Sequence, residues 1–299
     1  MMDDSRRWIG PTLVLGSAVL FSLSGVLTKA IAADGWTILT WRGLIGGVGI
    51  GAYVWLRSGR APRRTTFRLG RRGWGIAAVG AIGSITFIEA FKNTLVANVS
   101  VIYATIPFVA AGLERVLLGE PVRRRTLRAA TVTLLGVVLI VGGSLGSPNL
   151  DGDALAVAMV GLNALYMVLI RAFPETDSVL AGAAGGPMLF VAGWFFTEPL
   201  DVAGDDVVLL VLFGVVFAGA TVLWIEGTRL IPASESGLLG SAETPVAIGL
   251  AWLLLSEAPP WTSLVGAVVV LVAVIGHSWV DLRRDSRQAL PSGDDESHA

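Results

Sequence analysis

Apolar residues occur along the chain in runs of about 20, separated by short polar connections. A helix of about 20 apolar residues crosses the hydrocarbon core of a bilayer. The pattern therefore predicts ten membrane-spanning helices, at residues 11–33, 36–56, 73–95, 97–118, 127–146, 153–172, 179–199, 206–230, 233–256 and 261–281. Several connections are short, which favours antiparallel neighbours. We expect an all-α integral membrane protein.

The composition agrees with that fold class. Of the 299 residues, 54% are hydrophobic and 15% are charged, and the mean hydropathy is +0.71. Soluble domains carry roughly 25% charged residues. The chain has no cysteine, which excludes disulfides, thiolate metal sites and cysteine nucleophiles.

The N-terminal segment has one feature of a secretory signal peptide, because Arg6 and Arg7 precede the first apolar run. That run is about 22 residues long, whereas the apolar part of a signal peptide has roughly 7–15. We therefore interpret it as an uncleaved first span.

Basic and acidic residues alternate between the predicted connections. With the N-terminus inside, the cytoplasmic loops and tail hold Arg57, Arg60, Arg63, Arg64, Arg68, Arg71, Arg72, Arg123, Arg124, Arg125, Arg128, Arg283, Arg284 and Arg287. The outer loops hold Asp34, Asp151, Asp153, Glu198, Asp201, Asp205, Asp206 and Glu257, and no Lys or Arg. This asymmetry predicts that both termini are cytoplasmic. The arginine runs are then orientation signals that face anionic lipid, and nucleic-acid binding is not expected.

The two halves of the chain repeat one pattern about 137 residues apart. Residues 87–122 begin FIEAFKNTL, and residues 224–260 begin WIEGTRLIP; both continue with an Ala, a Ser, a proline inside the span and a closing Glu followed by Pro. Because each half has five spans, an odd number, the second copy must be inverted. Inverted repeats are typical of alternating-access transporters with a site near the midplane.

The repeat sets the expected domain boundaries. A cytoplasmic N-terminus covers residues 1–10, the first five-helix repeat 11–146, an outer linker 147–152, the second repeat 153–281 and a disordered cytoplasmic tail 282–299.

Each copy places a Glu and a basic residue three positions apart near one end of a span: Glu89 with Lys92, and Glu226 with Arg229. Such a pair shares a helix face. Either the basic member reaches the interface and anchors the helix end, or the two Glu residues are gating or proton-linked carboxylates on opposite sides of one cavity. The sequence leaves both alternatives open.

Pro107 and Pro245 fall close to the middle of their spans. Each removes a helical hydrogen bond and leaves the carbonyl four residues earlier, that of Tyr103 or Ser241, without its donor. In a membrane such carbonyls persist where protein or a water-filled cavity satisfies them. The prolines therefore indicate either kinks packed by neighbouring helices or a cavity between the two spans.

Polar and aromatic residues near the middle of the spans are candidates for substrate binding or gating. Glu243 is the ionisable residue closest to a span centre, where inserting an acid costs about 2.5–3.5 kcal/mol, and we expect it to face a cavity. Arg42 is expected to meet either Glu89 or an anionic group of the substrate. Asn163 and Tyr166, one turn apart, either line the same cavity or form an interhelical hydrogen bond. The candidates for stacking on a substrate are Trp41, Tyr103, Trp224 and Trp252.

Gly43, Gly47 and Gly51 recur at every fourth position of the second span and predict a close helix contact. The surrounding GGVGIGA does not match the dinucleotide-binding pattern and follows no strand. No nucleotide site is expected, and no phosphate-binding loop supports ATP hydrolysis.

Three segments resemble the two EamA domains of the drug/metabolite transporter superfamily: TWRGL at 40–44, EAFKNTLVANVSVIYATIPFVAAGLERVLLGEP at 89–121 and EGTRLIPASESGLLGSAETPVAIGLAWLLLSEAP at 226–259. The resemblance covers nearly all of residues 11–281. It implies a ten-helix, 5+5 inverted-repeat permease of a bacterial or archaeal inner membrane, with its site between the halves. It also implies that many relatives export amino acids or other small metabolites.

The resemblance also bears on single residues. It implies scaffold roles for Pro107, Glu120, Pro121, Pro245 and Glu257, which match common family positions. Glu89 departs from the family pattern, which often has an aromatic or small residue there. Glu89 and Glu226 are therefore better specificity candidates than Glu243.

We expect a secondary transporter that exports a small polar or amphipathic, amino-acid-like metabolite by alternating access, with proton coupling left open. The alternative on the same scaffold is a flippase for a lipid or lipid-linked sugar. A membrane-embedded enzyme is disfavoured, because HExxH and GxSxG are absent and His277 and His298 are the only histidines. The expected partners are a small molecule, the bilayer and protons, with no cofactor or metal, in a monomer or homodimer.

Overall fold

The computed structural model describes residues 4–60, 69–94, 96–121, 123–141, 150–255 and 261–288. Within these ranges the chain forms helices joined by turns: α1 (Asp4–Ala30), α2 (Gly35–Arg60), α3 (Arg71–Asn93), α4 (Val96–Tyr103), α5 (Ile106–Leu113), the π-helical η1 (Glu114–Leu118), α6 (Arg124–Val141), α7 (Leu150–Ala172), α8 (Ser178–Gly193), α9 (Gly204–Thr228), α10 (Ala233–Gly240), α11 (Glu243–Leu255) and α12 (Trp261–Gln288).

These elements make the ten predicted spans, which confirms the fold class. Two spans are interrupted: α4, α5 and η1 form the fourth, and α10 with α11 forms the ninth. By length and composition, six of the described spans are long and apolar enough to cross a bilayer. Ser178–Gly193 and Trp261–His277 are apolar but shorter.

The seventh span ends earlier than predicted, because α8 stops at Gly193 and the chain then turns. Two hydrogen bonds hold this turn, one to Asp34, the residue before α2, and one from Trp41 of α2. Thr197 Oγ1 donates to Asp34 Oδ2 at 3.0 Å, and Trp41 Nε1 donates to the carbonyl of Pro199 at 2.6 Å. The apolar run therefore continues for a few residues past the helix.

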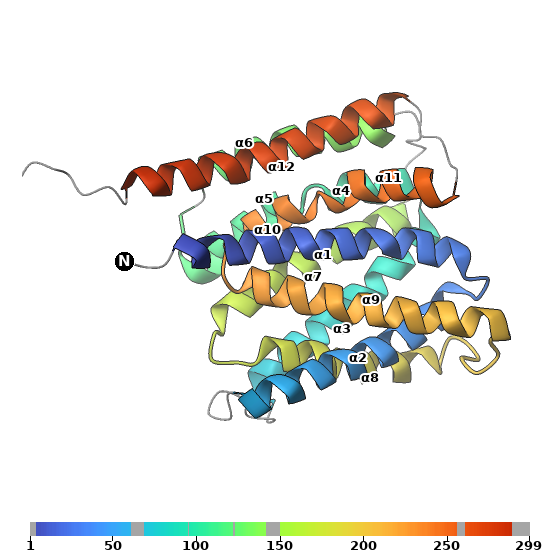
Figure 1. Cartoon of the computed structure of the whole chain (residues 1–299). Helices are drawn as coiled ribbons and strands as arrows, with labels where there is room; N and C mark the ends of the chain where they lie inside the picture. The colour runs from blue at the N-terminus through green and yellow to red at the C-terminus, as the bar shows by residue number, and fades with distance from the viewer. Residues whose placement is uncertain are drawn as a thin grey trace, which may run out of the picture.

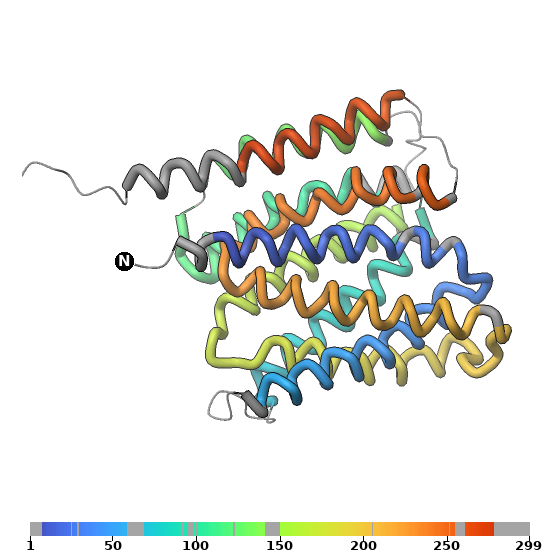
Figure 2. The backbone as a smooth tube through the Cα atoms, viewed as in Figure 1, coloured from blue at the N-terminus to red at the C-terminus, as the bar shows by residue number. Residues whose placement is uncertain are grey.

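The two halves interleave and do not form separate bundles. Helix α2 packs on α8, α6 on α12, α3 on α7, and α1 on α9. Figure 1 shows the α6–α12 pair along one edge of the molecule and the α2–α8 pair at the opposite edge. In Figure 2 the yellow-to-red second half alternates with the blue-to-green first half across the bundle. Such pairing is expected of two inverted copies that share one interior.

Glycines allow the central helices to approach closely. A Cβ added to Gly186 of α8 would lie 2.4 Å from the carbonyl oxygen of Gly43 and 2.7 Å from the Cα of Gly47, both in α2. The predicted contact stripe is therefore present at Gly43 and Gly47. Gly51 lies outside it, since a Cβ there would meet no atom within 4 Å.

The ends of the helices define two faces, which we name by their charge. The Arg-rich face carries Arg57, Arg71, Arg72, Arg123, Arg124, Arg125, Arg128, Arg171 and Arg229, and the Asp-rich face carries Asp34, Asp151, Asp153, Glu198, Asp201 and Asp206. Helix α1 begins at the Arg-rich face, and its counterpart α7 begins at the Asp-rich face. The sequences VLTKA at 26–30 and VLIRA at 168–172 end these two helices. Residues 61–68, 256–260 and 289–299, with the arginines and the Glu257 predicted there, lie outside the described residues.

Candidate functional site

A cavity of about 200 Å³ lies where the two halves meet. Its walls come from the first three spans and from the corresponding α7, α8 and α9 of the second half. The two interrupted spans complete it, with Tyr103 and Ile106 from one and Gly240 and Glu243 from the other. The cavity therefore combines both repeats in one site, as expected for a carrier with inverted repeats.

Both helix interruptions fall next to the predicted prolines. The fourth span breaks between Tyr103 and Ile106, directly before Pro107, and the ninth breaks between Gly240 and Glu243. Proline cannot donate the helical hydrogen bond, so the chain leaves the helix at these points. The Ser241 carbonyl, expected to lack a donor, accepts from the Thr244 amide at 3.3 Å.

Arg42 lines the cavity from α2 and is only 8% exposed. Its guanidinium carbon lies 4.5 Å from the centre of the Phe217 ring and 5.6 Å from that of Phe213, both in α9. Its Nε has no hydrogen-bond partner. Over the described side chains, Arg42 forms no ion pair. The predicted pairing with Glu89 is therefore wrong, because α2 turns Arg42 toward the rings of α9.

Four further predicted residues line the same cavity: Tyr103, Asn163, Tyr166 and Trp224. Glycines make room for two of them. A Cβ on Gly80 would lie 3.0 Å from the Tyr166 ring, and one on Gly240 would lie 2.9 Å from the Trp224 ring. Asn163 Nδ2 donates to the Met159 carbonyl at 3.0 Å within its own helix.

Glu243 lines the cavity at the first turn of α11. Among the described residues, neither a hydrogen bond nor an ion pair engages its carboxylate. Arg42 and Glu243 therefore share one cavity without forming an ion pair with each other. Trp252, a candidate for stacking, is 49% exposed on α11 and lies outside the cavity lining. Trp41 also lies outside it.

The two Glu residues of the repeated motif do not line the cavity. Glu226 lies at the Arg-rich face, where its Oε1 is 2.5 Å from Arg57 Nη1 and its Oε2 is 3.8 Å from Arg229 Nη1. Arg57 also contacts Asp177 at 2.5 Å. Glu226 therefore belongs to an ion-pair cluster that joins α2, the N-cap residue of α8 and α9, and it is not among the residues that line the cavity.

Glu89 lies near the Asp-rich end of α3, where it accepts a hydrogen bond from Asn93 at 3.2 Å. The side chain of Lys92, its expected neighbour, lies outside the described residues. Because Glu89 and Glu226 sit at opposite helix ends and away from the cavity wall, the structure does not place them on opposite sides of one cavity.

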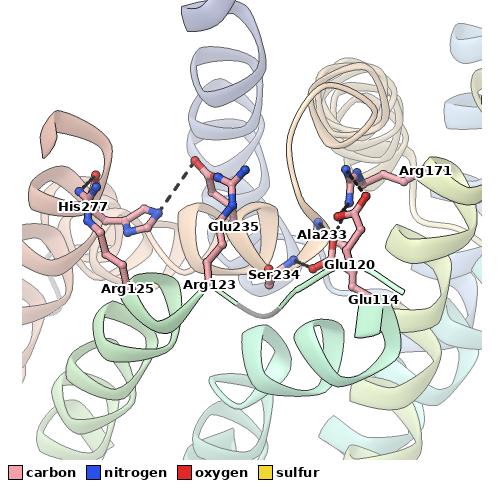
Figure 3. A network of polar contacts seen from close by, with 9 residues as sticks. All are labelled: Glu114, Glu120, Arg123, Arg125, Arg171, Ala233, Ser234, Glu235 and His277. Carbon is pink, nitrogen blue, oxygen red and sulfur yellow. Dashed lines mark hydrogen bonds and ion pairs between the residues drawn. The ribbon is translucent and has the colours of Figure 1, made fainter. Parts of the chain in front are cut away.

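The sequence did not single out a second polar network at the Arg-rich face, shown in Figure 3. Glu114, only 4% exposed, lies between Arg171 and the first residues of α10. Glu235 of α10 lies 3.6 Å from Arg123 and 3.9 Å from His277. The available signal was an acid, Glu114, inside an apolar run four residues before the end of its span.

The sequence also missed cavity-lining residues that are small or apolar: Phe21, Ser24, Ser84, Phe87, Phe217 and Thr221. Ordinary residue types carry no chemical signal of their own, so only the packing of the helices identifies them. Within the described residues no three His, Asp or Glu side chains converge as a metal site would require.

Comparison with known proteins agrees with this architecture. A solved crystal structure of another protein matches the chain with a TM-score of 0.78 and 20% sequence identity, over 92% of this chain and 98% of that one. At this identity the match shows the fold alone. No curated protein matches the chain. The model of the EamA-like transporter family matches twice, at residues 8–142 and 151–279, once for each repeat. The chain therefore belongs to the EamA-like transporter family, a family of membrane transporters of the drug/metabolite type.

Proposed function

We propose that this protein is a secondary carrier for small amphipathic solutes that bear an anionic group, and that Arg42 binds that group in the central cavity. The observation that carries the proposal is a buried arginine that lines the cavity without an acidic partner in the described structure. The family supplies the transport function, and the inverted repeat supports alternating access.

A buried guanidinium without a partner is unfavourable. Arginine stays charged under almost all conditions, and a buried charge is costly unless it is paired. The rings of Phe213 and Phe217 stabilise the cation in part. They leave its N–H groups available, and a guanidinium matches a carboxylate with two parallel hydrogen bonds. A carboxylate on the solute would supply the missing counter-charge.

The rest of the lining fits an amphipathic solute of amino-acid size. Phe21, Phe87 and Trp224 offer apolar and aromatic surface, and Asn163 with Tyr166 offers hydrogen bonds. Drug-sized ligands occupy pockets of about 300–1,000 Å³, so a cavity of about 200 Å³ favours smaller molecules. The aromatic lining would then select among anionic solutes by their apolar part.

Glu243 is the second charged group of the cavity. Ionisable residues inside a membrane commonly mark proton relays or substrate pathways. We propose that Glu243 carries the proton that is exchanged for the solute, and that the Arg-rich face lies in the cytoplasm, from which the solute is exported.

The test uses purified protein in proteoliposomes. The solutes are matched pairs: small amphipathic carboxylates and their neutral carboxamides. We expect carboxylate flux at least about tenfold above that of the carboxamides, and a similar loss in Arg42→Gln, because one charge-assisted contact is removed. Arg42→Lys should retain an intermediate flux. The matched control is Arg72→Gln, since Arg72 also lies over a ring, 4.9 Å from the centre of Phe173, but is exposed.

Two results would overturn the proposal. Carboxamides that cross as fast as carboxylates would remove the role of the anionic group, and full flux in Arg42→Gln would remove the role of the arginine. Translocation of labelled lipid without solute flux would instead support the flippase alternative.

A further inference from the structure

Helix α10 separates the cavity from the Arg-rich face. It contributes Gly240 to the cavity wall, and seven of its eight residues, Ala233 to Leu239, are buried. Its sequence, ASESGLLG, is unusually polar for a buried helix. Buried polar groups require partners, so the contacts of α10 show what holds it in place.

The first contact is at its N-terminus. Glu114, at the start of η1, accepts hydrogen bonds from the amides of Ala233 at 2.6 Å and Ser234 at 3.1 Å, one on each carboxylate oxygen. The first amides of a helix have no partner within the helix and carry partial positive charge. Glu114 therefore attaches the ninth span to the fourth through two charge-assisted hydrogen bonds.

Arg171 connects this carboxylate to a third span. Its Nη1 lies 2.7 Å from Glu114 and 2.8 Å from Glu120, and its Nη2 donates to Glu120 at 3.1 Å. Gly119, with φ of 70°, reverses the chain just before Glu120. This left-handed conformation favours glycine. Spans four, six and nine therefore meet at one buried acid (Figure 3).

The helices are also tightly packed between this acid and the cavity. A Cβ on Gly237 of α10 would lie 3.2 Å from Ile106 Cγ2 and 3.5 Å from the Cα of Pro107. Ile106 itself lines the cavity. The α5–α10 contact therefore forms the floor of the cavity, and Glu114 fastens it closer to the Arg-rich face.

The opposite face lacks this arrangement. By the inverted repeat, the counterpart of the α5–α10 contact is a contact between α11 and α4. Across the residues that the structure describes, these two helices form no comparable contact. The sequences GLERVLLGE at 112–120 and GLAWLLLSE at 249–257 place Ala251 where the first repeat has Glu114. The second repeat therefore has no acid at the position of Glu114.

We propose that Glu114 is the latch of a gate formed by α5 and α10, and that it makes closure at the Arg-rich face the resting state of the carrier. The proposal rests on the alternating-access function proposed above, but not on the identity of the solute. To expose the cavity to the Arg-rich face, α5 and α10 must separate, and Ala233 and Ser234 must leave Glu114. Because the second repeat has Ala251 instead, the reverse transition breaks no bond to an acid at this position.

Two single-cysteine reporters test the latch, and the chain has no cysteine to interfere. Ser236→Cys lies in α10, where Ser236 is fully buried, and Ser24→Cys lies on the cavity wall. Each is treated with a membrane-impermeant maleimide from one face at a time, in membrane vesicles of both orientations. In the otherwise unchanged protein, we expect Ser236→Cys to be protected and Ser24→Cys to react from the Asp-rich face.

When Glu114→Gln is added, labelling of both reporters from the Arg-rich face should rise by about tenfold or more. Labelling of Ser24→Cys from the Asp-rich face should fall. Arg171→Gln should act in the same direction but less, because Glu114 keeps its bonds to α10. The matched control is Asp206→Asn. Asp206 also accepts two backbone N–H bonds, from Ala32 and Ala33, but at the Asp-rich face, and its variant should not raise labelling from the Arg-rich face.

The outcomes separate this proposal from that of the solute. Unchanged labelling in both the Glu114 and Arg171 variants, in protein that elutes as one species, would overturn the latch. An equal rise from both faces would also overturn it, since that result indicates general loosening. If Glu114→Gln does not fold, the labelling of the reporters in Arg171→Gln tests the latch. The labelling experiment needs no solute. Unchanged labelling would contradict the latch, and unchanged flux in Arg42→Gln would contradict the solute proposal, so the two results are independent.

Discussion

The two faces of the molecule hold their helices together by different chemistry. At the Arg-rich face, ion pairs between spans are centred on Arg57 and Arg171. Among the described side chains of the Asp-rich face, carboxylates accept hydrogen bonds from neutral donors. Asp206 accepts from two backbone amides, Asp34 from Thr37 and Thr197, and Asp153 from Thr94 at 2.9 Å.

The difference follows from how the charges are distributed along the sequence. The connections at the Asp-rich face contain no Lys or Arg, as expected for the face opposite the positive-inside loops. Among the side chains that the structure describes, the acids there are satisfied by amides and hydroxyls. Removing one member of an ion pair leaves the other charge unpaired, whereas neutralising a carboxylate that is bonded to amides and hydroxyls leaves no unpaired charge and costs less. The two faces should therefore differ in their sensitivity to substitution.

The largest effect is expected at Arg57. It bridges Asp177 and Glu226, and the side chains of the three residues are 27%, 11% and 25% exposed. Arg57→Gln leaves Asp177 without its cation and Glu226 with Arg229 alone at 3.8 Å, and we expect a loss of about 2–3 kcal/mol, below the value for a fully buried pair because solvent reaches the cluster. Thermal unfolding of the purified protein in detergent measures it.

Arg229→Gln is the control for that experiment. Arg229 contacts the same Glu226, but at 3.8 Å, and donates to the Pro174 carbonyl at 3.3 Å. We expect a loss below about 1 kcal/mol. Equal losses in the two variants would show that the cluster depends on total charge and not on the Arg57 bridge.

At the Asp-rich face the corresponding variant is Asp206→Asn. Asp206 is 6% exposed and accepts from the amides of Ala32 at 3.2 Å and Ala33 at 3.1 Å. Asparagine keeps one of the two acceptors, so we expect a loss of about 1–2 kcal/mol. Asp201→Asn, at an exposed position of the same face, should change stability by less than about 0.5 kcal/mol. A loss at Asp206 that matches the loss at Arg57 would contradict the difference between the faces.

The sequence predicted the spans well because each depends on one strong local signal, about 20 apolar residues in a row. The inverted repeat was also readable, since two copies of a motif fell in halves with an odd number of spans. The end of the seventh span was missed, because hydropathy does not report where Asp34 and Trp41 bind the following turn.

The site was predicted less completely. Depth along a span identified Arg42, Tyr103 and Glu243 as cavity candidates, and all three line the cavity. Depth does not define the direction in which a side chain points. Position along the spans predicts a similar depth for Glu89 and Arg42, yet α2 turns Arg42 toward α9. The sequence left open whether Glu226 anchors its helix end or faces a cavity, because its partner Arg57 lies 169 residues away in sequence, a contact that only the folded arrangement reveals.

The smallest expected effect concerns acid and tests the Asp-rich face alone. The pKa of Asp34 is lowered: burial opposes this shift, but hydrogen bonds from Thr37, Thr197 and the Trp36 amide outweigh it. A group whose pKa is lowered by folding stabilises the protein above its unfolded pKa, here 3.8, and that stability is lost as the pH falls through the folded value. Asp34 is exposed, so we expect no more than about 0.5 kcal/mol of stability from it.

Unfolding measured from pH 7 to about pH 3 should therefore show a slightly shallower loss of stability toward acid in Asp34→Asn than in the unchanged protein or in Asp201→Asn. Identical acid profiles in all three would mean that solvent screening cancels the contribution of Asp34.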